Sequence, residues 1–349
     1  MHSPTDERME SIDLHSAARE GTLATLSPEL LSPERLIARN ASGHTPVHLA
    51  ARYGTLKDLP HGALTAPMFF IKNDAGYTPL HQAALGGHLD QIPAELLSLD
   101  ALLQRSNSGY TVFHLAAANG HLDQLPQGLL TYEVATLKND LGNTLLHEAA
   151  EGGHFDKLPI GLVTPASIRE KNISGETVLH VAALNGHLDQ VPIALLSREA
   201  MLEQTNAGDT VIHAAAISGH LGLIPADLLV HDNLVVASKT GFTAIHAAAE
   251  TGQLDKIPVE QLTRDLILTR NDNGDTPLHA AASEGHLDQI PAGILTKEVL
   301  MTRNYTGMTV GRLAIQQGHL DQIPSGVRPS RSALRLFFER IGAARTPFA

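Results

Sequence analysis

Histidine is the residue type in this sequence that could most readily do chemistry, because the chain contains 20 histidines and no cysteine. An imidazole ring can bind a metal ion, transfer protons or activate a nucleophile. Zinc would need several ligands within about 2.0–2.1 Å of one point. The histidines are instead spread along the chain, and most recur at intervals of 33 residues, as from His81 to His114. We therefore expect no metal-binding residues and no cofactor.

A second pattern, His-x-Asp, could suggest a catalytic dyad, as at His88 and Asp90. No nucleophile accompanies it, because the sequence has no Gly-x-Ser-x-Gly motif and no cysteine. The stretch from His147 to Glu151 lacks the second histidine of the His-Glu-x-x-His zinc motif, and no phosphate-binding or dinucleotide-binding glycine motif is present. We predict no catalytic residues and no enzymatic activity. The recurrence favours a structural role, in which a ring nitrogen satisfies the backbone of the adjacent turn.

The histidines belong to a longer phrase that is repeated along nearly the whole chain. In one copy it runs from Thr78 to Pro93, and in almost every copy a glycine follows the histidine slot by six residues and a proline follows it by twelve. A fixed period over ten copies predicts a repeat protein, in which each unit contacts only its neighbours. The histidine slot is occupied by His15, His48, His81, His114, His147, His180, His213, His246, His279 and Arg312.

The first part of each repeat predicts a helix with a defined start and end. Thr78 can cap it, Pro79 suits the first helical position, and Gly87 can supply the left-handed residue that ends it. The paired alanines Ala83 and Ala84 are small enough for neighbouring helices to approach at the short end of about 8–10 Å. A stack of closely packed helices follows from this pattern.

The second part of each repeat predicts two shorter helices and a turn. We expect Asp90 to cap a second helix with Pro93 in its first turn, or Pro93 itself to open it. Ser98 is then expected to cap a third helix of one to two turns. In a later repeat, the equivalent helix is expected to end near Asn271. An Asn-x-x-Gly turn, such as the one ending at Gly274, leads back to the next Thr-Pro-Leu-His.

Composition limits the partners and the location. The chain has 25 Lys and Arg against 37 Asp and Glu, a net charge of −12, which argues against nucleic acid as a partner. No apolar run is long enough to span a bilayer, and the first residues lack a signal-peptide core. We expect a monomeric cytoplasmic protein without a membrane span, and secretion by a signal-independent route is the alternative.

The chain is predicted to have three parts. Residues 1–10 form a polar lead-in, residues 11–325 form the repeat array, and residues 326–349 form a basic C-terminal segment. In the last part, one face of a short helix is predicted to carry the apolar side chains of Leu334, Phe337, Phe338 and Ile341. That helix would cap the open end of the array, as solenoids require. The alternative is a targeting or membrane-surface segment.

The repeated phrase resembles the signature of ankyrin repeats, most closely at Gly76 to His81 and at Gly274 to His279. The resemblance covers most of the chain and implies a helical solenoid. Ankyrin repeats continue their second helix without interruption and close with a β-hairpin finger. Here a proline interrupts that helix and a Thr-x-Glu helix stands where the finger would begin. We therefore predict an all-α, ankyrin-like α-solenoid of ten 33-residue repeats, with the β-finger largely replaced by a short helix.

The resemblance also implies where partners bind. Ankyrin repeats contact partner proteins mainly through the turn before Thr-Pro-Leu-His and through exposed positions of the first helix, which together form a concave surface. Carried over to this sequence, the candidate partner-binding residues are Tyr53, Tyr77, Tyr110, Asn143, Glu176, Asp209, Phe242 and Asp275. The aromatic members are candidate hot spots, unless they only cover the neighbouring turn. Acids expected on the same surface, including Glu148, Glu151, Glu250 and Glu284, suggest a basic partner patch.

These observations predict a non-catalytic scaffold that binds unknown partner proteins through its concave turn and first-helix surface. A secreted or translocated effector, which would use the same surface on a protein of a foreign cell, is the first alternative. A metal-binding or enzymatic protein that uses the repeat histidines is the second.

Overall fold

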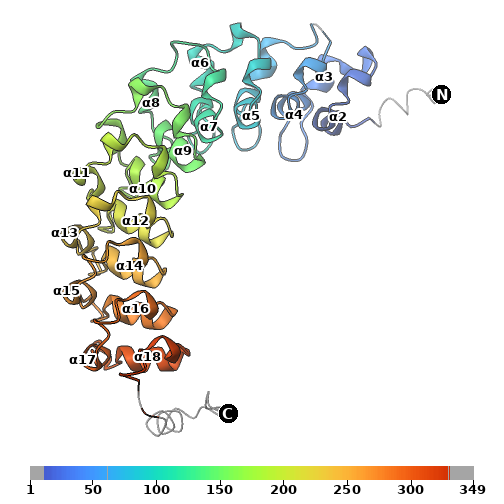
Figure 1. Cartoon of the computed structure of the whole chain (residues 1–349). Coiled ribbons are helices and arrows are strands. Elements are labelled where there is room, and N and C mark those ends of the chain that lie inside the picture. The colour runs from blue at the N-terminus through green and yellow to red at the C-terminus, as the bar shows by residue number, and fades with distance from the viewer. Residues whose placement is uncertain (1–11, 61, 329, 331–349) are drawn as a thin grey trace. The chain divides into compact units, whose positions relative to one another are not determined.

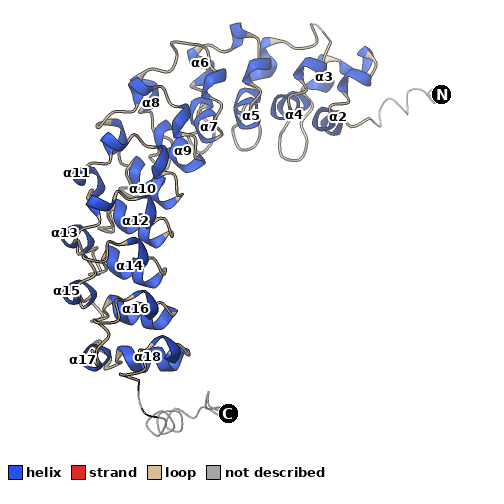
Figure 2. Ribbon diagram, viewed as in Figure 1, coloured by secondary structure: helices blue, strands red, loops and turns tan. Residues whose placement is uncertain are grey.

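The fold is a stack of short helices joined by tight turns (Figures 1 and 2). The computed structural model describes residues 12–60, 62–328 and 330. The chain divides into two compact units, Met1–Ala200 and Met201–Ala349. Each unit is built from the same kind of repeat, so one repeat explains most of the local structure.

The first helix of each repeat begins and ends as predicted. In helix α5 (Pro79–Gly86), the side chain of Thr78 and the side chain of His81 cap each other's backbone N–H groups, and Pro79 takes the first helical position. The helix ends at Gly87, which has the left-handed φ of 76°. The equivalent helices are α2 (Leu14–Glu20), α4 (Pro46–Tyr53), α7 (Val112–Ala118), α9 (Leu145–Gly152) and α10 (Val178–Leu184) in the first unit, and α12 (Val211–Ile217), α14 (Ala244–Glu250), α16 (Pro277–Glu284) and α18 (Val310–Gln317) in the second.

These first helices pack against one another in chain order. In the first unit, α2, α4, α5, α7, α9 and α10 form one row, and in the second unit α12, α14, α16 and α18 form another (Figure 1). Ala83 and Ala84 have no exposed surface, because their small side chains face the neighbouring helices. Larger side chains at these positions would push the helices apart. The core of each repeat is completed by buried leucines such as Leu80 and Leu89.

The predicted second helix is wrong in detail, because two 3₁₀ segments replace it. Asp90 does not cap a helix but lies inside η5 (Leu89–Gln91), and Pro93 precedes η6 (Ala94–Leu96). Proline restricts the preceding residue to extended geometry, and Ile92 adopts φ −82° and ψ 132°, so the helix cannot continue through it. The segments equivalent to η5 are η1 (Leu23–Thr25), η3 (Leu56–Asp58), η7 (Leu122–Gln124), η8 (Phe155–Lys157), η11 (Leu188–Gln190), η13 (Leu221–Leu223), η15 (Leu254–Lys256), η16 (Leu287–Gln289) and η17 (Leu320–Gln322). Those in the place of η6 are η2 (Pro28–Leu31), η9 (Ile160–Leu162), η12 (Ile193–Leu195) and η14 (Ala226–Leu228).

The third helix exists but is shorter than predicted. Ser98 accepts a hydrogen bond from the N–H of Ala101 and so caps helix α6 (Leu99–Leu102), as expected. Helix α15 (Arg264–Ile267) ends well before Asn271, since Leu268, with φ −103° and ψ 3°, has already left helical geometry. The other members are α3 (Pro33–Leu36), α8 (Tyr132–Ala135), α11 (Arg198–Met201), α13 (His231–Leu234) and α17 (Lys297–Leu300), and the 3₁₀ segments η4 (Ala66–Phe70) and η10 (Ser167–Arg169) take this place in two repeats.

Between repeats, a tight turn stands where an ankyrin repeat would have its β-hairpin finger. The N–H of Gly274 donates to the carbonyl of Asn271 at 2.9 Å, and the N–H of Asn271 donates to the carbonyl of Asp275 at 2.9 Å. No strand forms in the described part of the chain, where only isolated bridges such as Arg303 to Thr309 remain. The prediction of a helical solenoid with the β-finger largely lost is confirmed.

Two further observations complete the fold. None of the helices in residues 12–60 and 62–328 is both long and apolar enough to cross a bilayer. The predicted lead-in, residues 1–10, and the predicted capping helix near Leu334 and Phe337 lie outside the described residues.

Candidate partner-binding face

The candidate residues that follow each turn glycine, which we call the display residues, are held by their main chain. The N–H of Tyr77 donates a hydrogen bond to Oδ1 of Asn73, in its own turn, at 2.9 Å. The carbonyl of Tyr77 accepts a hydrogen bond from His48, which belongs to the preceding repeat, at 3.0 Å. Both polar groups of the display residue are thus satisfied by fixed neighbours. Its side chain is left free to vary.

The histidines of the repeated phrase make this arrangement possible. The Nδ1 atom of His48 accepts the N–H of Thr45 at 3.1 Å and lies 2.8 Å from the Thr45 hydroxyl, so Nδ1 carries no proton. Nε2 therefore carries the proton that it donates to Tyr77. Carbonyl groups of display residues are bound in the same way by His15, His81, His147, His213, His246 and His279. The predicted structural role of the histidines is confirmed by these bonds.

Burial keeps the histidines neutral. It lowers the pKa of His48, His81, His114 and His147 to about 4, despite the hydrogen bonds to carbonyl groups that favour the charged form. In the second unit, burial likewise lowers the pKa of His213, His246 and His279. Both nitrogens of such a ring are already engaged, so a metal ion could bind only by breaking these bonds. In the described part of the chain, no group of three or more His, Cys, Asp or Glu is arranged to hold a metal ion.

The aromatic display residues are half-buried. Their rings pack on the histidine of their own repeat, with ring centroids 5.5 Å apart for Tyr77 and His81 and 5.3 Å apart for Phe242 and His246. Tyr110 packs on His114 at 6.1 Å, and burial raises the pKa of its hydroxyl to about 12. Tyr53, at the end of α4, is more open, with 44% of its surface exposed. The aromatic rings therefore cover part of their own repeat and still present an edge to solvent.

The polar display residues of the first unit form a network that differs from the prediction. Glu148, expected on the surface, is 3% exposed, and Asn143 is also buried. The side-chain amides of Asn139 and Asn143 both donate to Oε1 of Glu148, at 2.9 and 3.1 Å. Burial raises the pKa of Glu148 to about 7. The candidate Glu176, half-buried, accepts from Asn172 at 2.8 Å, and Asn172 also donates to Asn143.

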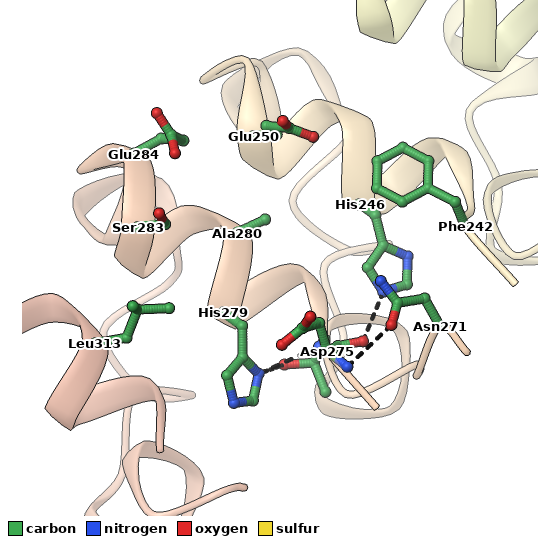
Figure 3. A pocket seen from close by; sticks show the side chains of 11 residues that line it. Phe242, His246, Glu250, Asn271, Asp275, His279, Ala280, Ser283, Glu284 and Leu313 are labelled. Carbon is green, nitrogen blue, oxygen red and sulfur yellow. Dashed lines mark hydrogen bonds between the residues drawn. The ribbon is translucent and has the colours of Figure 1, made fainter. Parts of the chain in front are cut away.

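In the second unit, a groove opens between the turn of one repeat and the first helices (Figure 3). It has a volume of about 250 Å³ and brings together the predicted residues Phe242 and Asp275 with the acids Glu250 and Glu284. The candidate Asp209 is half-buried and does not line it. Sequence reasoning did not find the other lining residues, which are Asn271, Thr276, Ala280, Ser283 and Leu313 together with the two buried histidines His246 and His279. The small residues Ala280 and Ser283 on one face of α16 were the signal that could have indicated room for a ligand.

The helical repeats, each with a display residue after its turn, define an α-solenoid. A family model described as ankyrin repeats (3 copies) matches residues 146–226, 179–258 and 225–292. Residues 146–292 therefore contain ankyrin repeats, as the repeated phrase predicted. Ankyrin repeats are generally protein–protein interaction modules and are typically non-catalytic. A comparison with curated proteins finds no match.

Proposed function

We propose that this protein is a scaffold that binds partner proteins through its turn-and-helix face, meaning the display residues together with the exposed positions of the first helices. The observation that carries the proposal is the hydrogen bonding of the display residues. Their backbones are fixed on both sides, as at Tyr77 between Asn73 and His48, while their side chains change from repeat to repeat. A face that is rigid in its main chain and varied in its side chains suits specific recognition, because little order has to be gained on binding.

Partner capture by two matched triple variants tests this function. The first variant, Tyr77→Ala with Tyr110→Ala and Phe242→Ala, shortens three aromatic display residues. The second, Tyr132→Ala with Ile193→Ala and Val259→Ala, removes three exposed apolar side chains that lie away from the face, at 43, 78 and 68% exposure. Cross-linking capture from a lysate, quantified by mass spectrometry, compares both with the unchanged protein.

The proposal expects proteins that are captured by the unchanged chain and by the second variant but lost from the first. Aromatic side chains at the centre of an interface commonly cost more than 2 kcal/mol when truncated, so a loss of thirtyfold or more is expected. Equal capture by all three proteins would show that this face does not bind the partner. Thermal unfolding of the three proteins, measured first, ensures that the comparison is made between folded chains.

A further inference from the structure

The groove of the second unit is lined by one aromatic ring, by small side chains and by two acids at the ends of its helices. Phe242 lies beside it before α14, and Ala280 on α16 faces α14 (Figure 3). Leu313 on α18 closes the far side. Glu250 and Glu284 are the last residues of α14 and α16, and both are exposed. The groove is therefore lined by polar and apolar groups in similar measure, with Phe242 on one side and two carboxylates at the helix ends.

The position of these two acids gives the helices no electrostatic stabilisation. The C-terminal end of a helix carries partial negative charge, so acids are favoured at the start of a helix and not at its end. Among the described residues, neither Glu250 nor Glu284 makes an ion pair or a hydrogen bond through its carboxylate. Asp275, at the other end of the groove, differs because Asn304 donates to its Oδ1 at 2.7 Å. Two carboxylates that are free and disfavoured by their own helices complement a cation from outside the chain.

We propose that this groove receives an arginine side chain from the partner protein, with its guanidinium group between Glu250 and Glu284 and its flat face and stem against Phe242. This inference rests on the proposed function and specifies the chemistry of the partner. Arginine fits better than lysine because its planar guanidinium stacks on an aromatic ring and offers five donors, which two separate carboxylates can share. Lysine offers a compact, strongly hydrated charge that gains less from the aromatic ring.

A titration followed by NMR tests the groove with a defined probe. The chain is labelled at alanine and leucine methyl groups, and the probe is the blocked tripeptide acetyl-Gly-Arg-Gly-amide. Two related tripeptides carry citrulline or lysine in place of arginine. Citrulline keeps nearly the same shape without the charge, so it separates charge from packing. The methyl resonances of Ala280 and Leu313 report on the groove itself.

The matched variants change the same number of charges in two places. Glu250→Gln with Glu284→Gln alters the groove, and Asp227→Asn with Glu260→Gln alters two exposed acids elsewhere in the second unit. The proposal expects the arginine peptide to shift the Ala280 and Leu313 methyl signals, and the groove variant to weaken binding about tenfold. The second variant binds as the unchanged protein does. Citrulline binds at least tenfold more weakly than arginine, and lysine falls between them.

Three results would overturn the inference. Citrulline could bind as well as arginine, the two variants could bind the arginine peptide equally, or magnesium or calcium alone could shift the same methyl signals and displace the peptide. Failure here is distinguishable from failure of the proposed function. If the groove variant still captures the partner that the aromatic triple variant loses, the scaffold function stands and the arginine assignment falls. If the aromatic triple variant captures every partner, the proposed face is wrong whatever the peptide does.

Discussion

At the scale of single residues, the repeat histidine was predictable and the buried acid was not. A histidine that returns every 33 residues beside a capping threonine has one structural job in every copy, and the bonds of His48 to Thr45 and Tyr77 show what that job is. Glu148 directly follows the repeat histidine, in a slot that holds an apolar residue in most other repeats, such as Leu115 and Val181. Its burial depends on the hydrogen bonds that Asn139 and Asn143 donate to it from the turn, and these bonds follow from how this one repeat folds.

The neutral histidines predict that the protein loses stability in mild acid. Their pKa falls from about 6.5 in the unfolded chain to about 4 in the folded one, as for His81 and His114. The unfolded chain therefore binds more protons between pH 6.5 and pH 4, so stability is full above 6.5 and is lost as the pH falls through this window. At pH 5 each such histidine costs about 2 kcal/mol. Urea denaturation followed by circular dichroism should show a midpoint that drops steeply from pH 7 to pH 5.

A control for this prediction is His81→Gln, which removes one titrating ring and should lessen the slope by one proton. Glu148 acts in the opposite direction, because its pKa of about 7 in the folded chain exceeds the ordinary value of 4.5. Its contribution favours folding at low pH and is lost as the pH rises from 4.5 to 7. Because seven buried histidines have a lowered pKa, the net slope should follow them. A midpoint that does not change between pH 7 and pH 5 would contradict the assignment of neutral histidines.

At the scale of elements, the sequence predicted the first helix better than the second. The first helix has its signals at both ends, Thr78 and Pro79 at the start and Gly87 after it, and each acts locally. The second element was harder because Pro93 is compatible with the first turn of an α-helix and with a break between two 3₁₀ turns. The choice is made by packing, since Leu89 and Ile92 are both buried and the chain must bend between them.

The glycine that ends the first helix has a second role, which a pair of substitutions can isolate. Gly120 and Gly219 both adopt left-handed geometry, with φ of 77° and 88°. A Cβ atom at Gly120 would lie 2.8 Å from the ring of His154 in the next repeat, whereas one at Gly219 would meet nothing within 4 Å. Gly219→Ala should therefore cost only the backbone strain, about 1–2 kcal/mol. Gly120→Ala should cost roughly 1 kcal/mol more, because the ring must move.

Urea unfolding of both variants measures this difference. The double variant Gly120→Ala with His154→Ala supplies the control, because it removes the ring that the new methyl group meets. Its coupling energy should recover the extra cost found for Gly120→Ala. Equal destabilisation by Gly120→Ala and Gly219→Ala would mean that the histidine ring adapts freely and does not fix the spacing of the repeats.

At the scale of the whole molecule, the class of fold followed from the period, but the groove did not. A fixed spacing predicts stacked units whatever their details. The groove depends on which slots happen to hold small residues, such as Ala280 and Ser283, next to an aromatic display residue such as Phe242. The sequence places these residues in equivalent slots of a repeat, and only the packing of α14, α16 and α18 decides how much space is left.

The repeat period itself predicts which internal deletion the chain tolerates. Removing residues 144–176 takes out one whole period and joins Asn143 to Thr177, so the turn, the cap and the helix interfaces keep their register. We expect a folded protein whose helical circular dichroism per residue is unchanged, because each unit contacts only its neighbours. Removing residues 144–173 deletes nearly as much chain but breaks the register.

The second deletion serves as the control and should unfold at a much lower urea concentration, because the Thr and His of the junction no longer meet their partners. Size-exclusion chromatography and urea denaturation of the two deletions make the comparison. Equal stability of both would show that the register of the repeats matters less than the amount of helix.

The way the display residues are held has a consequence for how recognition can change over time. Because the main chain at Tyr77 is fixed by Asn73 and His48, and not by the tyrosine side chain, the identity of that residue is separated from the stability of the fold. Residues as different as Tyr77, Glu176 and Met308 occupy this slot without altering the turn. A single substitution there can create or abolish a contact with another protein at little risk of unfolding. Evolution could thus redirect such a chain from one partner to another by changing these slots one at a time.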